Sequence, residues 1–309
     1  THDLLFEAFW SGLSRLGEGA PRAPVTVEVP GGEGSEAGKV IVRKSWSAEE
    51  VLRRKDFAHM SAEELRQAAR LIEALTLSLE RRPTRRYELH VHGSHLAPRP
   101  MMRRSLATGG ELLDWVWRRR RTEPRSITLI LDVSGSMDAY ARVLLRFAHA
   151  LARVNRRTET FVFGTRLTRV TKALRARRAD DALAAVSAVV ADFSGGTRIG
   201  GSLRDFNRRW ARRISPSNSI VIVLSDGWDR GDPALVGSET ARLRRNSHRL
   251  LWLNPLAGAP GYQPLAAGMA AAARHVDALL PAATLDDLAS LARVLTDSGW
   301  GVSPVRHAA

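Results

Sequence analysis

Residues 126–138 read SITLILDVSGSMD, and this stretch decides the fold class. The apolar and β-branched run from Ile127 to Leu131 has the length and composition of a strand that is buried on both faces. It ends abruptly in Asp132, Ser134 and Ser136. Because open α/β folds bind ligands at the carboxyl ends of their strands, these three side chains are candidates for a binding site.

Strands and helices alternate after this stretch, which predicts a doubly wound, mainly parallel α/β sheet. Asp232 followed by Pro233 predicts the N-terminus of one helix, because an acid caps a helix and proline is favoured at its first position. The other predicted elements are a helix over 138–155, a strand pair in TETFVFG and LTRVTKAL, helices over 180–190 and 199–213, strands in SIVIVLSDG, HRLLWLNP and HVDALLP, and helices over 263–273 and 284–296.

The first part of the chain is predicted to be mainly α-helical. Ser47 with Glu50, and Ser61 with Glu64, have the spacing of capping boxes at two helix starts. From Arg81 to Pro124 the sequence is rich in arginine, which we interpret as an extended basic connector with one helix over about 110–120. We therefore predict a helical N-terminal region with its connector over 1–124 and the α/β domain over 125–309.

Three loops carry polar groups that the predicted sheet would bring to one edge. The first holds Asp132, Ser134 and Ser136, the second is SGGTRIGGS around Thr197, and the third is LSDGWDRGD with Asp226. Carboxylate and hydroxyl oxygens without nitrogen or sulfur are hard ligands, which favour Mg²⁺ or Mn²⁺ over zinc or copper. A divalent ion would also offset the repulsion between two neighbouring carboxylates.

The D-x-S-x-S of DVSGS, Thr197 in its glycine-rich loop and Asp226 in SDG resemble, in their order and distances, the metal-ion-dependent adhesion site of von Willebrand factor A domains. The resemblance covers nearly everything after Ser45 and points to the CoxE-like family. The phrases that carry it are SWSAEEVLRRKDFAHMSAEELRQAARLIEAL, MMRRSLATGGE, FVFGTRLTRVTKAL, FSGGTRIGGSL, FNRRWARR, LSDGWDRGDP and HRLLWLNPLAG. It implies a Rossmann-like von Willebrand A fold.

The resemblance also implies roles for the five residues. Ser134 and Ser136 would bind the ion directly, Asp132 and Asp226 mostly through hydrogen-bonded water or serine, and Thr197 directly in one state. Neutral hydroxyls leave the ion's charge incompletely neutralised, so it would attract a carboxylate from a partner, which is binding chemistry without a protein nucleophile. Relatives work with MoxR-type AAA+ ATPases in the maturation of metalloenzymes such as carbon monoxide dehydrogenase, so we expect a non-enzymatic adaptor.

The composition of the chain indicates which partners and which compartment to expect. The formal net charge is +15, a basic excess that attracts polyanions, acidic protein surfaces or anionic lipid. No recognition motif for nucleic acid accompanies that charge, so we expect no nucleic-acid partner, while peripheral membrane contact stays open. The sequence has no cysteine, no secretory signal and no apolar run long enough to span a membrane, so we expect a cytoplasmic protein.

Several other interpretations stay open at this point. A strand-end aspartate also suits a Mg²⁺-dependent phosphohydrolase, the basic excess suits a nucleic-acid-binding protein, and a plain scaffold would ignore metal. The glycine-rich loop lacks the G-x-x-x-x-G-K-[ST] pattern of an ATPase. His90, His92 and His95 are either exposed connector residues or transition-metal ligands. Trp228 either anchors a partner or fills the underside of its loop.

Overall fold

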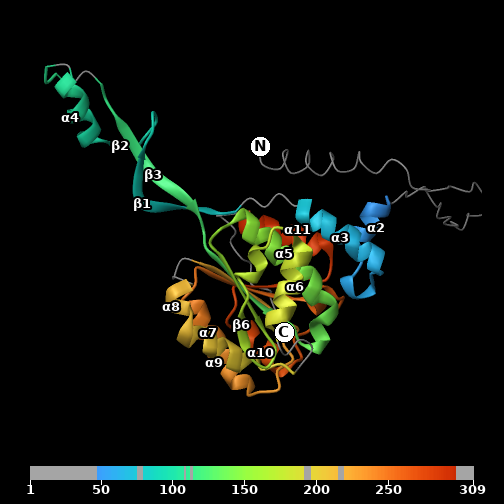
Figure 1. Cartoon of the computed structure of the whole chain (residues 1–309). Helices are drawn as coiled ribbons and strands as arrows, with labels where there is room; N and C mark the ends of the chain where they lie inside the picture. The colour runs from blue at the N-terminus through green and yellow to red at the C-terminus, as the bar shows by residue number, and fades with distance from the viewer. Residues whose placement is uncertain are drawn as a thin grey trace, which may run out of the picture.

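A six-stranded sheet forms the centre of the protein in a computed structural model (Figure 1). The structure describes residues 47–74, 79–107, 109–111, 114–190, 196–214 and 219–296, so the first 46 residues lie outside the described part. The sheet order is β6-β5-β4-β7-β8-β9, and every neighbouring pair is parallel except β5 with β6. The strands are β4 (Ile127–Asp132), β5 (Thr158–Phe163), β6 (Leu167–Arg169), β7 (Ile220–Leu224), β8 (Arg249–Asn254) and β9 (Ala278–Pro281).

The order of the strands creates a switch point at the centre of the sheet. β4 is the first strand of this sheet along the chain, and the chain then builds outward to β5 and β6 before returning to β7 on its other side. Loops that leave β4 and β7 therefore turn toward opposite faces, which opens a crevice between their carboxyl ends. Asp132 and Asp226 are located at these two ends, as the sequence predicts.

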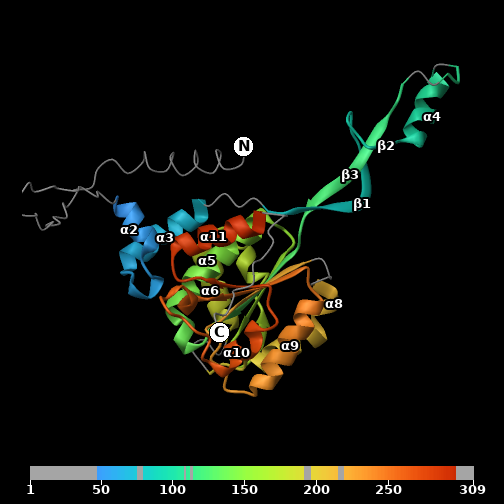
Figure 2. The same ribbon diagram turned by 180° about the vertical axis from the view of Figure 1, so that it is seen from behind.

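Helices cover both faces of the sheet, so every residue of β4 and β7 is buried (Figures 1 and 2). Leu129 and Leu131 pack into one core with residues of α5 (Asp138–Val154), α6 (Ala179–Val189) and α11 (Leu285–Thr296). Ile130 points to the opposite core. That core includes residues of α7 (Ile199–Arg209), α8 (Ala211–Ile214), α9 (Pro233–Arg245) and α10 (Ala267–Ala273). The predicted doubly wound α/β fold is confirmed.

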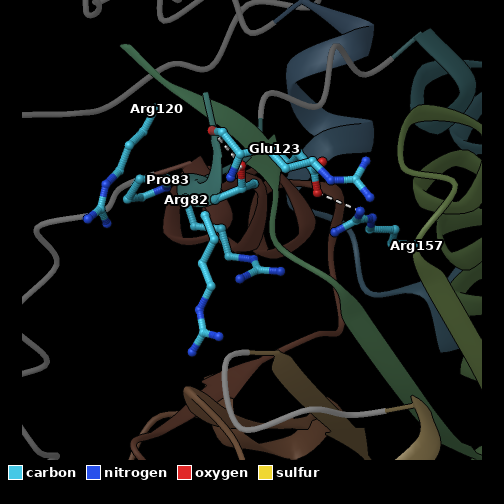
Figure 3. A pocket seen from close by; sticks show the side chains of 8 residues that line it. Arg82, Pro83, Arg120, Glu123 and Arg157 are labelled. Atoms are coloured by element: carbon cyan, nitrogen blue, oxygen red, sulfur yellow. Dashed lines mark hydrogen bonds and ion pairs between the residues drawn. The ribbon is translucent and has the colours of Figure 1, made fainter. Parts of the chain in front are cut away.

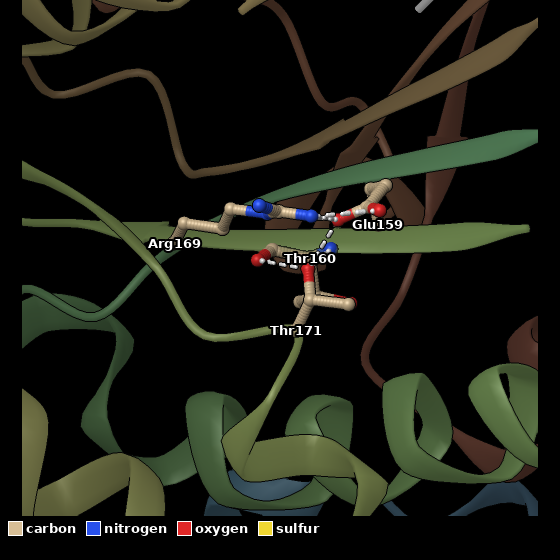
Figure 4. A network of polar contacts seen from close by, with 4 residues as sticks. All are labelled: Glu159, Thr160, Arg169 and Thr171. Atoms are coloured by element: carbon tan, nitrogen blue, oxygen red, sulfur yellow. Dashed lines mark hydrogen bonds and ion pairs between the residues drawn. The ribbon is translucent and has the colours of Figure 1, made fainter. Parts of the chain in front are cut away.

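A polar network holds the antiparallel edge strand β6 in place (Figure 4). The guanidinium of Arg169 donates to both carboxylate oxygens of Glu159, at 2.8 to 3.0 Å. Thr171 donates its hydroxyl proton to Glu159 at 2.6 Å, and its Oγ1 accepts from the backbone N–H of Thr160 at 3.0 Å. The network therefore ties β6 and the turn after it to β5.

The helices before the sheet have the predicted N-termini and share the sheet's core. They are α2 (Ala48–Arg54), the 3-10 helix η2 (Phe57–His59) and α3 (Ala62–Ala74). Glu50 N–H donates to the hydroxyl of Ser47, which confirms the predicted start of α2, and Ser61 and Glu64 exchange two side-chain-to-backbone bonds, which confirms the second capping box. Phe57 is buried in the core that lies over α5 and α11, and its N–H donates to Ala283 O at 2.9 Å. The boundary at 124/125 stays a prediction.

An arm projects from the body between these helices and the sheet (Figures 1 and 2). It consists of β1 (Arg81–Leu89), β2 (His95–Leu96), α4 (Pro98–Ala107) and β3 (Trp117–Pro124), in the sheet order β1-β3-β2. The prediction of a helix over about 110–120 is wrong, because antiparallel pairing with β1 supplies hydrogen bonds to the backbone of β3. The pairing also gives two of the consecutive arginines partners across the strands, with Arg119 bonded to Glu88 and Arg118 over the ring of Tyr87.

A buried ion pair anchors the base of the arm. Glu80 is buried, and one of its carboxylate oxygens lies 2.6 Å from Nε of Arg125. The backbone of Glu80 also donates to Leu295 O in α11 at 2.8 Å and accepts from Arg125 N at 3.0 Å. These contacts join the strands that enter and leave the arm to α11. Within the described residues, no helix is both long enough and apolar enough to cross a lipid bilayer.

Candidate metal centre

The first loop of the candidate site is folded around the carboxylate of Asp132. The N–H of Ser134 donates to Asp132 Oδ1 at 3.0 Å, which bends the chain at the end of β4. The hydroxyl oxygens of Ser134 and Ser136 are 3.3 Å apart, so these side chains lie together. Asp132 and Ser134 are buried, whereas Ser136 is exposed. Hydroxyl oxygens thus line the open side of the loop, with the carboxylate beneath them.

Ser225 joins the first loop to the third. Its hydroxyl donates to Asp132 Oδ2 at 2.7 Å, and its Oγ accepts from the N–H of Gly227 at 3.1 Å. Sequence reasoning missed this residue, although a serine directly before Asp226 at the end of a buried strand was a signal that could have found it. Ser225 is fully buried, so it holds two strand ends together from below the crevice.

Asp226 lies beside Asp132 at the neighbouring strand end. Its Oδ1 accepts from the N–H of Trp228 at 3.0 Å, and its backbone carbonyl accepts from the side chain of Asn254 at 3.2 Å. Burial raises the pKa of Asp132 from 3.8 to about 6, and the charge of Asp226 adds to the rise, while hydrogen bonds from Ser225 and Ser134 oppose it. The two carboxylates are therefore close enough to interact electrostatically.

Thr197 is held in place by the third loop. Its carbonyl accepts from Arg230 N at 3.1 Å, and the carboxylate of Asp229 accepts from the N–H of Ile199 at 2.9 Å. Asp229 thereby caps α7 from another loop, since Arg198 at the N-cap position makes no capping bond of its own. Thr197 is buried, and its hydroxyl makes no hydrogen bond with a residue that the structure describes.

The structure links all three loops through the third one. Asp132, Ser134 and Ser136 are connected by hydrogen bonds, Ser225 attaches Asp132 to the strand end of Asp226, and the backbone of Arg230 attaches Thr197. No direct side-chain contact joins Thr197 to the other four predicted site residues among the interactions between described residues. That these five residues hold a metal stays a prediction.

The atoms of this crevice that are available to bind a ligand are mainly carboxylate and hydroxyl oxygens. Asp226 Oδ2 and the hydroxyl of Thr197 have no hydrogen-bond partner among the described residues, and Ser136 is bonded to Ser134 alone within that set. Hydroxyl and carboxylate oxygens are the donors that Mg²⁺ and Mn²⁺ take in proteins. The donor set thus fits a hard dication chemically.

Three other predictions from the sequence can be compared with the structure. Asp232 caps α9, accepting from Ala234 N at 2.9 Å, so its predicted role is confirmed. Trp228 is 67% exposed, so it does not fill the underside of its loop. The rings of His90 and His92 lie 6.1 Å apart in the arm. In the described part of the chain, no three His, Cys, Asp or Glu side chains gather as a metal site.

Solved structures that are similar to this chain include von Willebrand A proteins. A von Willebrand factor type A protein from Catenulispora acidiphila is 19% identical, with a TM-score of 0.39 over 59% of this chain and 44% of that one. Proximal thread matrix protein 1 from the mussel byssus, with a zinc occupied MIDAS motif, is 17% identical, with a TM-score of 0.36 over 56% of this chain and 44% of that one. This chain thus spans less than half of either protein.

A conserved hypothetical protein, BatB from Bacteroides thetaiotaomicron, is 15% identical, with a TM-score of 0.34 over 55% of this chain and 96% of that one. No curated protein sequence matches the chain. The model of the family described as VWA domain containing CoxE-like protein matches residues 67–288, which include the arm, the sheet and all three loops. The match covers well over half of the chain, which therefore belongs to the CoxE-like family of proteins with a von Willebrand A domain.

Proposed function

We propose that this protein is a non-catalytic, metal-dependent adaptor that binds partner proteins through the crevice between β4 and β7. Ser134, Ser136 and Thr197 would hold Mg²⁺ or Mn²⁺ directly, with Asp132 and Asp226 in support. The bound ion would supply an electrophilic position for a carboxylate of the partner. The observation that carries the proposal is the gathering of hydroxyl and carboxylate oxygens at the switch point of the sheet.

The electrostatics of Asp132 support a cation at this place. Ionised Asp132 is buried next to Asp226, and the pKa of its carboxyl is raised to about 6 mainly by that burial. At neutral pH the group is charged at a cost in folding free energy. A dication beside the two carboxylates would offset both the burial and their mutual repulsion.

The position of Asp132 argues against the alternative of a phosphohydrolase with this residue as its nucleophile. Its side chain is fully buried, and both of its carboxylate oxygens accept hydrogen bonds, from Ser134 N and from the hydroxyl of Ser225. A nucleophile that attacks phosphorus needs an oxygen that can reach the substrate. We therefore favour binding over catalysis.

The rim of the crevice offers a surface for a protein partner. Trp228 lies two residues after Asp226 and is 67% exposed, and large aromatic side chains often anchor protein interfaces. Membership of the CoxE-like family supports a MoxR-type AAA+ ATPase as one partner and a metalloenzyme under maturation as the client. Trp228 and a metal-bound carboxylate of the partner would then form adjacent contacts.

Direct metal titration tests the first part of the proposal. We expect the full chain to bind Mg²⁺ in isothermal titration calorimetry and Mn²⁺ in electron paramagnetic resonance. Ser136→Ala and Thr197→Ala should each weaken binding by roughly tenfold or more. Ser136 is exposed and Ser238 is an exposed serine on α9, so Ser238→Ala is a matched control that should bind like the wild type. Unchanged affinity in both site variants would refute the metal site.

A pull-down tests the second part. The tagged chain is mixed with the MoxR-type ATPase encoded in the same genome, in Mg²⁺ or in EDTA. We expect capture in Mg²⁺ that is lost in EDTA and in Ser136→Ala but kept in Ser238→Ala. Capture that is equal under all four conditions would show a scaffold that ignores metal. A chain that binds Mg²⁺ and captures no ATPase would keep the metal site and overturn the partner.

A further inference from the structure

A cleft of about 630 Å³ is located where the arm joins the body (Figure 3). Arginines surround it, and Glu123 is the acid among its described lining residues. Glu123 lies at the end of β3, shortly before the start of β4, and Arg157 directly precedes β5. The cleft therefore lies at the amino ends of the parallel strands, at the opposite edge of the sheet from Asp132 and Asp226.

Most of the positive charge of this cleft has no acidic partner among the described residues. Arg157 is paired with Glu123 at 2.5 Å, and Figure 3 shows this contact at one side of the cleft. The other four arginines make no ion pair with a described residue, and they are Arg82, Arg85, Arg86 and Arg120. Like charges around one cleft repel one another, so a multiply charged anion would lower the free energy of the folded state.

The backbone of β1 is shaped to place these arginines. Pairing with β3 is regular up to Pro83 and resumes at Tyr87, with a bulge between them. Thr84 stabilises the bulge, because its Oγ1 accepts from the N–H of Arg86 at 3.2 Å. Bulges redirect side chains and are frequent beside functional sites. Arg82 is half-buried, and its Nε has no acceptor among the described residues.

The arginine side chains that line the cleft favour an anionic ligand with phosphate groups. Guanidinium groups bind phosphate oxygens with paired hydrogen bonds. The four guanidinium groups that have no ion pair with a described residue carry more positive charge than a ligand with a single carboxylate could neutralise. Pro83 and Thr84 are the uncharged members of the described lining, so it offers no aromatic surface for a nucleobase. We infer that this cleft binds a small polyphosphate anion, recognised through a pyrophosphate or triphosphate group.

Calorimetric titration with inorganic pyrophosphate and tripolyphosphate tests this inference. The full chain is first freed of divalent ions with EDTA, because polyphosphates chelate Mg²⁺, and the result is then independent of the candidate metal centre. We expect one site per chain and a rise in the melting temperature with each anion. Arg85→Gln with Arg120→Gln should weaken binding by at least about tenfold, since charged hydrogen bonds are lost.

A second double variant separates a built site from general attraction to a basic protein. Arg99→Gln with Arg103→Gln removes the same charge from exposed positions of α4, outside the cleft. We expect this variant to bind tripolyphosphate within about twofold of the wild type. Equal losses in the two double variants, or no binding of either anion by the wild type, would overturn the inference. A single-stranded oligonucleotide that binds while tripolyphosphate fails to displace it would also overturn the inference and indicate a nucleic-acid surface.

Discussion

Asp132 is a buried acid whose ionisation opposes folding when no metal is bound. Burial raises its pKa from 3.8 to about 6, so the folded chain holds the proton more tightly than the unfolded chain. The stabilisation that comes from this tighter proton binding is complete below about pH 4, and it is lost as the pH rises through about 6. In EDTA at neutral pH, Asp132→Asn should therefore raise the free energy of unfolding by roughly 1–3 kcal/mol in urea titrations.

The pH dependence separates this effect from a general effect of the substitution. The difference between wild type and Asp132→Asn should shrink toward zero near pH 4, because the wild-type carboxyl is then neutral. Asp181 is exposed on α6, so Asp181→Asn serves as a control that changes the unfolding free energy by less than about 0.5 kcal/mol. A difference that is constant from pH 4 to pH 8 would contradict the assignment.

Gly227 determines the path of the third loop directly after Asp226. Its φ is +85°, and an added Cβ would lie 2.4 Å from Cβ of Met269 in α10. Gly227→Ala should lower the free energy of unfolding by roughly 2–4 kcal/mol, through backbone strain and overpacking together. Gly261 has a φ of +72° with open space around it, so Gly261→Ala should cost only about 1 kcal/mol. Equal losses in urea titrations would show that packing against α10 is unimportant.

At the scale of elements, the edge strand β6 depends on one buried hydroxyl. Thr171 bonds both to Glu159 and to the backbone of Thr160 (Figure 4). Thr171→Val keeps the shape but removes the acceptor of the buried Thr160 N–H and one of the donors to Glu159, so we expect a loss of roughly 1–3 kcal/mol in the free energy of unfolding. Thr168 lies in β6 and has no side-chain hydrogen bond with a described residue, so Thr168→Val should be nearly neutral. Faster hydrogen exchange of β6 amides would accompany the Thr171 change alone.

At the scale of the whole molecule, the helices before the arm complete the core of the sheet domain. Phe57 is 1% exposed and packs in the core that contains β4, α5 and α11. Phe57→Ala should lower the free energy of unfolding by roughly 3–5 kcal/mol in a single cooperative transition. Val51 in α2 is 55% exposed, so Val51→Ala should change little. A separate transition for the N-terminal helices would instead indicate an independent domain.

Elements whose pattern reflects local chemistry could be predicted from the sequence. The capping boxes of Ser47 and Ser61 and the cap at Asp232 were recognisable because each bond joins residues close in the chain. The buried strands of β4 and β7 were recognisable from their continuous apolar runs. The arm was not, because β1 and β3 are rich in arginine and exposed, and their pairing joins residues 29 to 43 positions apart, as in Leu89 with Arg118 and Arg81 with Pro124.

The sequence by itself determined the doubly wound sheet and the strand ends at which Asp132 and Asp226 stand, because alternating apolar segments allow few ways to bury themselves. Only the tertiary structure decided how the loops are joined and where the arginines meet. Ser225 reaches Asp132 across 93 positions, and Asp229 reaches the start of α7 across 30. Such contacts depend on the packing of distant segments, and the polar residues that make them have no periodic pattern that would reveal their partners.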